Sequence, residues 1–176
     1  MKKMKEFRKI SVIGLGLIAS SICLTLRQKD PTIKLVGYDK DKVVRYRAKK
    51  IGLCKVESNL DIAVSGSLLI ILCVPVGQMQ AVTQKLKKII EPGTTITDVG
   101  SVKLSVIEEI ESNIESVGGK YVPSHPIAGT ERSGPEAGYA GLFEGRWCIL
   151  TPTKKTNKKA LNSLETYWNF LGMQTK

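Results

Sequence analysis

The sequence predicts an α/β fold of the Rossmann-like, doubly wound kind, with a mostly parallel sheet and helices on both of its faces. Short apolar runs typical of strands alternate along the chain with amphipathic stretches typical of helices. This alternation favours parallel strands joined by crossover helices. One run, Leu68–Val74, is apolar throughout, as expected of a strand that is covered on both faces. Sheets of this kind bind ligands at the carboxyl ends of their strands, so functional residues are expected there.

Local patterns predict each element in turn. Lys9–Ile13 is a strand, and Leu17–Lys29 is a helix because its apolar residues recur on one face. The further strands expected are Ile33–Tyr38, Leu68–Val74, Thr94–Val99, Lys120–Pro123 and Trp147–Thr151. The further helices expected are Lys42–Ile51, a short helix capped by Ser58 and ending at Val64, Gln78–Ile90, a helix from near Lys103 that ends at Gly118-Gly119, and Lys158–Leu171. Residues 126–145 are rich in Gly, Pro, Ala and Glu, which predicts a long ordered loop or a broken helix.

The start of the chain also fits a second interpretation. Residues 1–9 are basic and residues 10–26 are uncharged and mostly apolar, as in a secretory signal peptide. The apolar run is shorter than the roughly 20 residues that a membrane-spanning helix needs. It divides at Gly14 and Gly16 into a strand and a helix, which favours a strand–turn–helix unit. No association with a membrane is expected.

Length and charge limit the class of protein. A chain of 176 residues fits one ordinary domain; we expect residues 1–172 to form it and residues 173–176 to begin a following element. The 27 Lys and Arg residues exceed the 16 Asp and Glu residues and give a formal net charge of +11. Such a charge attracts polyanions, phosphates or carboxylates, but a Lys-rich solvated surface explains it as well. Aromatic residues make up 6% of the chain and are not interleaved with a basic stripe, so no nucleic-acid partner is expected.

The cysteines and the single histidine argue against a metal site. No two of the four cysteines have CxxC spacing, and the only histidine, His125, lies far from most of them. Cys23, Cys73 and Cys148 fall in apolar runs, where a reduced cysteine behaves as a small hydrophobic residue. We therefore expect no metal and a cytoplasmic location.

The turn after the first predicted strand has the pattern of a dinucleotide-binding loop. Gly14 would allow a tight turn, Gly16 would let a pyrophosphate approach the backbone, and Ala19 is small enough for the helix to pack on the strand. The N–H groups that follow, at Leu15, Leu17 and Ile18, would hold the phosphates. The pattern alone is weak, but a strand precedes it and a helix follows it.

Two further strand ends complete a candidate cofactor site. Asp39 lies directly after the second predicted strand, where a carboxylate accepts hydrogen bonds from the adenosine ribose and repels a 2′-phosphate. NAD is therefore the expected cofactor, and NADP is less favoured, although Lys40 and Lys42 leave it open. The alternative is that Asp39 is a turn residue. Val74–Val76 follows the buried strand and either passes beneath the dinucleotide or is a plain connection.

Ser101 and His125 are the candidate catalytic residues. Ser101 follows the strand Thr94–Val99, and it either contacts substrate and cofactor or only caps the next helix. His125 lies at another predicted strand end, beside the expected cofactor crevice. An imidazole with a pKa near its usual value serves as a general base at neutral pH, although a lone histidine is more often structural.

At these residues the sequence resembles the prephenate/arogenate dehydrogenase family, whose members transfer a hydride in tyrosine biosynthesis. The matching segments occur in the family's order: GLGLIASS at 14–21, YDKD at 38–41, CVPV at 73–76, TDVGSVK at 97–103, HPIAGTERSG at 125–134 and LTPTKKT at 150–156. TDVGSVK and HPIAGTE are far more specific than the glycine pattern.

The resemblance implies NAD(P)-dependent oxidative decarboxylation of prephenate, or of the related arogenate. It implies that His125 takes the proton of the substrate hydroxyl and that Ser101 helps to hold that hydroxyl. It places Gly129, Thr130 and Glu131 in a substrate or gating loop. Full-length members are implied to be homodimers with a helical C-terminal domain, to which nothing in this chain corresponds.

The sequence departs from the family pattern at one position, and two other functions are possible alternatives. Ser20 stands where the family usually has glycine, and we expect its side chain to weaken pyrophosphate binding modestly. The rivals are a dinucleotide-binding module without catalysis and a different Rossmann dehydrogenase, such as a hydroxyacid or imine reductase. The TDVGSVK and HPIAGTE segments argue against the second rival.

Overall fold

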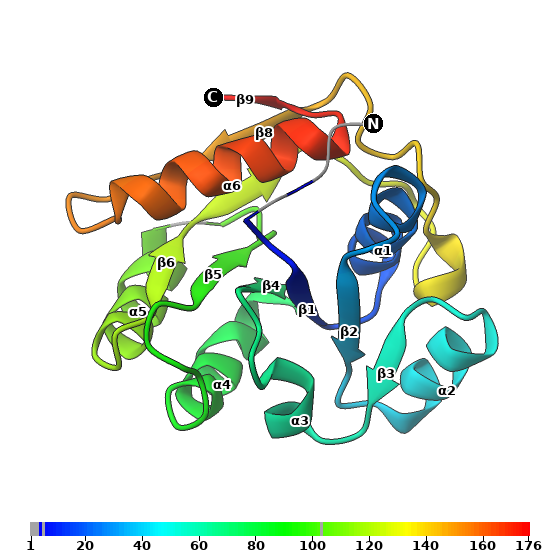
Figure 1. Cartoon of the computed structure of the whole chain (residues 1–176), viewed down its shortest axis with the longest axis horizontal. Coiled ribbons are helices and arrows are strands. Elements are labelled where there is room, and N and C mark those ends of the chain that lie inside the picture. The colour runs from blue at the N-terminus through cyan, green and yellow to red at the C-terminus, as the bar shows by residue number, and fades with distance from the viewer. Residues whose placement is uncertain (1–3, 5, 103) are drawn as a thin grey trace.

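A six-stranded parallel sheet forms the centre of the molecule (Figure 1). The structure is a computed structural model that describes residues 4, 6–102 and 104–176. The strands of this sheet are β1 (Lys9–Ile13), β2 (Lys34–Tyr38), β3 (Lys55–Glu57), β4 (Leu69–Leu72), β5 (Thr95–Asp98) and β6 (Lys120–Val122). They lie in the order β3-β2-β1-β4-β5-β6. The order reverses between β1 and β4, the point at which such sheets bind ligands, and the predicted doubly wound fold is confirmed.

In the part of the chain that the structure describes, six α-helices cover the two faces of the sheet (Figure 1). They are α1 (Leu17–Lys29), α2 (Lys42–Lys50), α3 (Leu60–Val64), α4 (Val76–Leu86), α5 (Leu104–Glu115) and α6 (Lys158–Leu171). Strand β4 shows how the core is divided: Leu69 and Ile71 join the cluster that includes α1 and α6, whereas Ile70 and Leu72 join the cluster that includes α4 and α5. Because successive side chains of a strand point to opposite faces, a strand buried on both faces must be apolar throughout.

A second, three-stranded sheet was not predicted. It consists of β7 (Ser124–Pro126), β8 (Trp147–Leu150) and β9 (Gln174–Thr175), with β7 antiparallel and β9 parallel to β8. Strand β3 was missed as well. Runs of two or three residues are too short to show alternation, and their conformation comes from pairing with distant strands.

Several predicted boundaries were wrong. Asn59, not Ser58, caps α3, and its Oδ1 accepts hydrogen bonds from the backbone N–H groups of Asp61 (2.7 Å) and Ile62 (3.2 Å). Helix α4 begins at Val76, directly after Pro75, and ends at Leu86, so both of its ends come earlier than predicted. Lys103, near which α5 was expected to begin, lies outside the described residues.

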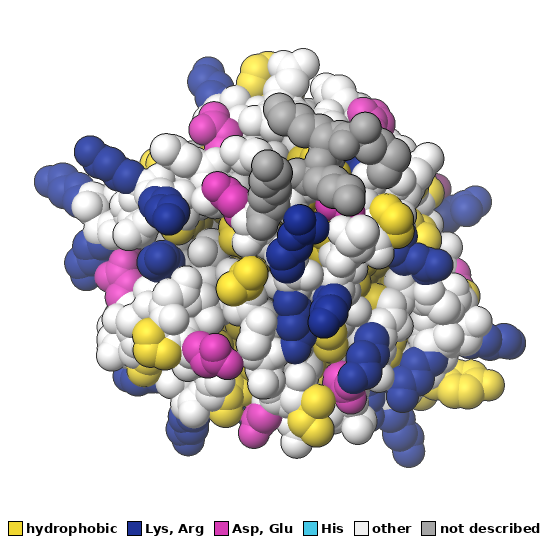
Figure 2. Space-filling view, in the orientation of Figure 1, with side chains coloured by type: hydrophobic (Ala, Val, Ile, Leu, Met, Phe, Trp, Pro, Cys, Tyr) yellow, Lys and Arg dark blue, Asp and Glu magenta, His cyan; other side chains and the backbone are white. Residues whose placement is uncertain are grey.

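Many of the basic side chains that give the chain its net positive charge lie on the surface. On the face drawn in Figure 2, Lys and Arg side chains are spread widely and are interspersed with Asp and Glu, which is typical of a solvated surface. Across the described ranges, no helix is both long and apolar enough to cross a membrane.

Candidate nucleotide-binding site

The turn after β1 requires glycine at its first position. Gly14 has a φ of +90°, and its N–H donates a hydrogen bond to the Tyr38 carbonyl oxygen at 2.8 Å. A Cβ atom at this position would lie 2.7 Å from the carbonyl oxygen of Cys73. The ends of β1, β2 and β4 therefore meet at a point where no side chain fits.

The N-terminus of α1 is open at Gly16. This residue is the N-cap of the helix, no side chain caps it, and the first turn contains no acidic residue. A Cβ atom on Gly16 would meet nothing within 4 Å, so the space in front of the helix is clear. The first helical hydrogen bond runs from Ser20 N–H to the Gly16 oxygen. The preceding N–H groups, including those of Leu17 and Ile18, have no partner within the helix and can bind an anion.

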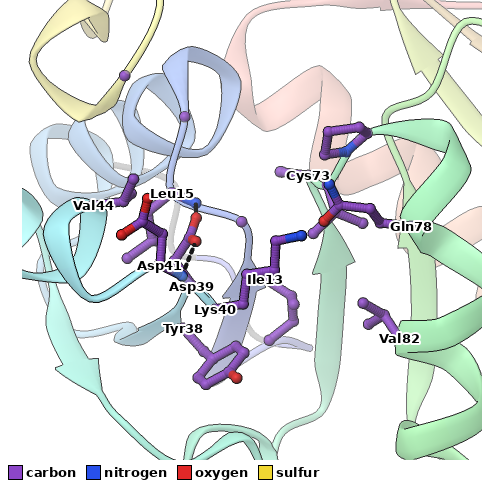
Figure 3. A pocket seen from close by; sticks show the side chains of 15 residues that line it. Ile13, Leu15, Tyr38, Asp39, Lys40, Asp41, Val44, Cys73, Gln78 and Val82 are labelled. Carbon is purple, nitrogen blue, oxygen red and sulfur yellow. Dashed lines mark hydrogen bonds between the residues drawn. The ribbon is translucent and has the colours of Figure 1, made fainter.

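Asp39 is fixed against the glycine turn. Its Oδ2 accepts a hydrogen bond from Leu15 N–H at 2.8 Å, and its Oδ1 accepts one from Asp41 N–H at 2.9 Å (Figure 3). Each carboxylate oxygen has a further lone pair that can accept a bond from a hydroxyl. The N–H of Leu15 is thus already bonded to Asp39, and the Leu15 side chain is buried in the core. Leu15 is therefore less available to bind a phosphate than the sequence suggested.

These groups surround a pocket of about 400 Å³. Figure 3 shows Asp39, Asp41 and Val44 on one wall and Cys73, Gln78 and Val82 on the opposite wall. The predicted cofactor residues that line it are Gly14, Leu15, Gly16, Asp39, Val74 and Pro75. The predicted cofactor residues Leu17, Ile18, Val76 and Ser101 are not among its described lining residues.

Sequence reasoning missed several of the lining residues. Tyr38 is the last residue of β2, and the strand-end rule would have found it. Val44, Gln78 and Val82 lie on the first two turns of α2 and α4, where only the packing of the helices shows which side chains face the crevice. Gly134 comes from a loop far along the chain, and no local signal marks it.

A buried carboxylate connects the two segments that carry the candidate catalytic residues. Asp98, at the end of β5, is fully buried. Its Oδ2 accepts a hydrogen bond from Gly100 N–H (2.9 Å), its Oδ1 accepts one from the Tyr121 hydroxyl (2.8 Å), and its carbonyl oxygen accepts one from the Ser124 hydroxyl (2.7 Å). Burial, together with the neighbouring Asp98, raises the pKa of Tyr121, so its hydroxyl remains a donor.

Ser101 directly follows Gly100 and is exposed, and His125 directly follows Ser124 and is half-buried. His125 comes shortly after the end of β6, the strand expected before it, but it is also the central residue of β7, a strand that was not predicted. The segments of both residues are tied to Asp98, although neither residue is among the described lining of the pocket. Gly129, Thr130 and Glu131 are exposed in the loop that follows β7.

Ser20 was expected to affect pyrophosphate binding, but its side chain does not line the described pocket. Its side chain is fully buried, and a Cβ atom on Gly138 would come within 2.4 Å of the Ser20 Cβ. Ser20 therefore packs beneath the long loop and is not among the described lining residues of the pocket.

The sheet order and the open helix N-terminus at the switch point define a nucleotide-binding domain of the Rossmann class. Comparison with known families narrows this class. The family model described as "Prephenate dehydrogenase, nucleotide-binding domain" matches residues 22–175, and the chain belongs to this family.

Individual relatives agree with the family. The chain is 39% identical to a cyclohexadienyl dehydrogenase of Zymomonas mobilis, and the match covers 96% of this chain and 57% of that protein. It superposes with a TM-score of 0.88 on a prephenate dehydrogenase from A. aeolicus in complex with hydroxyphenyl propionate and NAD+, at 30% identity over 96% of this chain and 59% of that chain. An arogenate dehydrogenase from Synechocystis gives a TM-score of 0.86 at 28% identity, over 96% of this chain and 58% of that chain. The chain thus spans less than two thirds of the length of these relatives.

Proposed function

We propose that this chain binds NAD as the cofactor domain of an enzyme that oxidatively decarboxylates prephenate to 4-hydroxyphenylpyruvate in tyrosine biosynthesis. The observation that carries the proposal is the open N-terminus of α1 beside Gly16, with Asp39 fixed at the same pocket. The open helix end fits a pyrophosphate, and the carboxylate fits the ribose hydroxyls. When bound, NAD supplies a nicotinamide ring that accepts a hydride.

The roles proposed for the chain's own residues concern the substrate hydroxyl. The hydroxyl-bearing ring carbon loses a hydride while the imidazole of His125 takes the hydroxyl proton, and Ser101 helps to hold that hydroxyl. Loss of the ring carboxylate as CO2 makes the ring aromatic. Arogenate is the alternative substrate, and the similarity to an arogenate dehydrogenase supports this alternative. Gly129, Thr130 and Glu131 are proposed to contact or gate the substrate.

The wider context is part of the same proposal. The proposed NAD(P)-binding domain includes the predicted boundary at residue 172 and the residues after it, since Met173 is buried in the core and Gln174–Thr175 pair with β8 as strand β9. Full-length members of the family are proposed to be homodimers in the cytoplasm.

Calorimetric titration with NAD and with NADP tests the cofactor assignment. The wild-type chain is expected to bind NAD more tightly than NADP, and Asp39→Asn is expected to reduce that preference by removing the charge that repels a 2′-phosphate. Asp61→Asn, which removes an exposed charge on α3, is the matched control. Tighter binding of NADP by the wild-type chain would overturn the role of Asp39.

NADH formation from prephenate and NAD tests the catalytic part. Turnover that His125→Asn abolishes would support the proposed base. Intact NAD binding without turnover, even when a helical partner domain is supplied, would favour the rival of a non-catalytic nucleotide-binding module.

A further inference from the structure

The long loop after β7 is held against helices α1 and α2 by hydrogen bonds. We call residues 134–144 of this loop the strap. Its later part is held on α1, where Tyr139 N–H donates to the Ser21 hydroxyl (3.1 Å) and the Thr25 hydroxyl donates to the Ala140 carbonyl oxygen (2.8 Å). Residues 129–133, which precede the strap, are exposed. The strap is thus anchored at its later end and preceded by an exposed segment.

The early part of the strap is held to α2 by a bidentate ion pair between Glu136 and Arg47. Glu136 lies on the 3-10 turn η1 (Pro135–Ala137). Its Oε1 accepts a hydrogen bond from Arg47 Nε at 2.8 Å and its Oε2 accepts one from Arg47 Nη2 at 2.5 Å. Two parallel bonds of this kind fix orientation as well as distance. The hydrogen bond from Arg47 lowers the pKa of Glu136, and Glu136 raises the pKa of Arg47, so both are ionised at neutral pH.

The same guanidinium lies against Gly134, which lines the cofactor pocket. A Cβ atom on Gly134 would lie 3.0 Å from Arg47 Nη2, and the residue has a φ of +88°. Helix α2, which carries Arg47, is capped by Asp41, a residue of the same pocket. One side chain therefore connects the helix beside the proposed ribose site to the loop at the pocket wall.

We propose that Arg47 and Glu136 are a positioning pair that holds Gly134 at the wall of the nucleotide pocket and so strengthens dinucleotide binding. The inference rests on the proposed function, because it takes a dinucleotide as the ligand. Neither side chain contacts the ligand in this role; each acts by fixing the strap to α2. Breaking the pair frees the early strap, and binding then has to order it again.

Four single variants test the pair with matched charge changes. Arg47→Gln and Glu136→Gln break it. Lys29→Gln and Glu144→Gln break the ion pair at the other end of the strap, whose nitrogen and oxygen lie 2.9 Å apart. Each control removes the same charge as its test variant, so a general electrostatic effect on an anionic ligand cancels. Unchanged thermal midpoints would verify folding, and the charge-reversed double variant Arg47→Glu/Glu136→Arg retains a pair.

The dissociation constant for NAD is measured for each variant. Both test variants are expected to weaken binding by about two- to five-fold, the range for exposed pairs. The double variant Arg47→Gln/Glu136→Gln should bind NAD no more weakly than either single variant does. The charge-reversed variant should regain NAD affinity, and the controls should bind NAD as the wild type does. Weakening by Arg47→Gln alone would mean that Arg47 contacts the cofactor directly, and equal weakening by the controls would mean that the effect is not local. Either result overturns the proposal.

A second readout separates this inference from the proposed function. Arg132 is exposed just before the strap, so the rate of tryptic cleavage after it reports whether the strap is held. Faster cleavage in the two test variants, but not in the controls, is expected. A wild-type chain that does not bind NAD would overturn the proposed function, whereas unchanged cleavage in the test variants would overturn the positioning pair.

Discussion

Replacing Gly14 with alanine should destabilise the fold, whereas the same change at Gly16 should not. At Gly14 the new Cβ would lie 2.7 Å from the Cys73 carbonyl oxygen and the backbone φ is +90°. The positive φ costs a residue with a side chain about 1–2 kcal/mol. The overlap is with backbone rather than with a flexible side chain, and overpacking of this kind adds about 1–3 kcal/mol. The free energy of unfolding should therefore fall by about 2–5 kcal/mol.

Gly16→Ala provides the matched comparison. Its Cβ would meet no atom within 4 Å, and its φ of −85° suits alanine. Because alanine is a poorer N-cap than glycine, a loss of less than about 1 kcal/mol is expected. The added methyl group would stand in the open space before α1, so NAD affinity should fall even though the fold is retained.

Urea unfolding followed by circular dichroism measures both variants. A Gly14→Ala midpoint close to that of the wild type would refute the argument that the ends of β1 and β4 exclude a side chain. Equal destabilisation by the two variants would refute it as well, because the reasoning assigns the cost to one position only.

Three further predictions follow from the contacts described. Asp98→Ala should lower the free energy of unfolding by about 3–5 kcal/mol, because it leaves buried donors without their acceptor; a loss below about 1 kcal/mol in chemical denaturation would contradict this. The Thr32 hydroxyl is the main cause of the lowered pKa of Asp30; the stability that this carboxylate contributes is therefore present above its unfolded pKa and lost as the pH falls through its folded pKa. Asp30→Asn should flatten that acid-dependent loss in unfolding measured across pH. Burial raises the pKa of Cys73, so iodoacetamide should label this thiol slowly at pH 8 in the folded chain and rapidly after unfolding.

The sequence predicted the strands of the central sheet apart from β3, because the signals of the other strands are local. The apolar run that contains β4 marks a strand covered on both faces, and the boundaries of β1 and α1 were predicted as the structure has them. The glycine turn and Asp39 could be placed at one pocket, since parallel strands bring their carboxyl ends together.

The parts that could not be predicted depend on contacts between distant residues. Strands β7 and β9 exist because β8 pairs with both of them, and neither has a pattern of its own. Arg47 and Glu136 are 89 positions apart, so no spacing rule connects them. The wall that Gly134 adds to the pocket depends on how the strap crosses α1 and α2, which follows from tertiary packing.

The double hydrogen bonding of Asp39 has a consequence for cofactor engineering. The carboxylate already accepts from Leu15 N–H and Asp41 N–H, so the glycine turn is preorganised before any ligand arrives. A redesign toward NADP that replaced Asp39 with a small neutral residue would remove the proposed repulsion of a 2′-phosphate and would also detach the turn that is proposed to bind the pyrophosphate. Gains in specificity and losses in affinity would then come from one substitution. A successful redesign has to supply a new acceptor for Leu15 N–H together with the new phosphate contact.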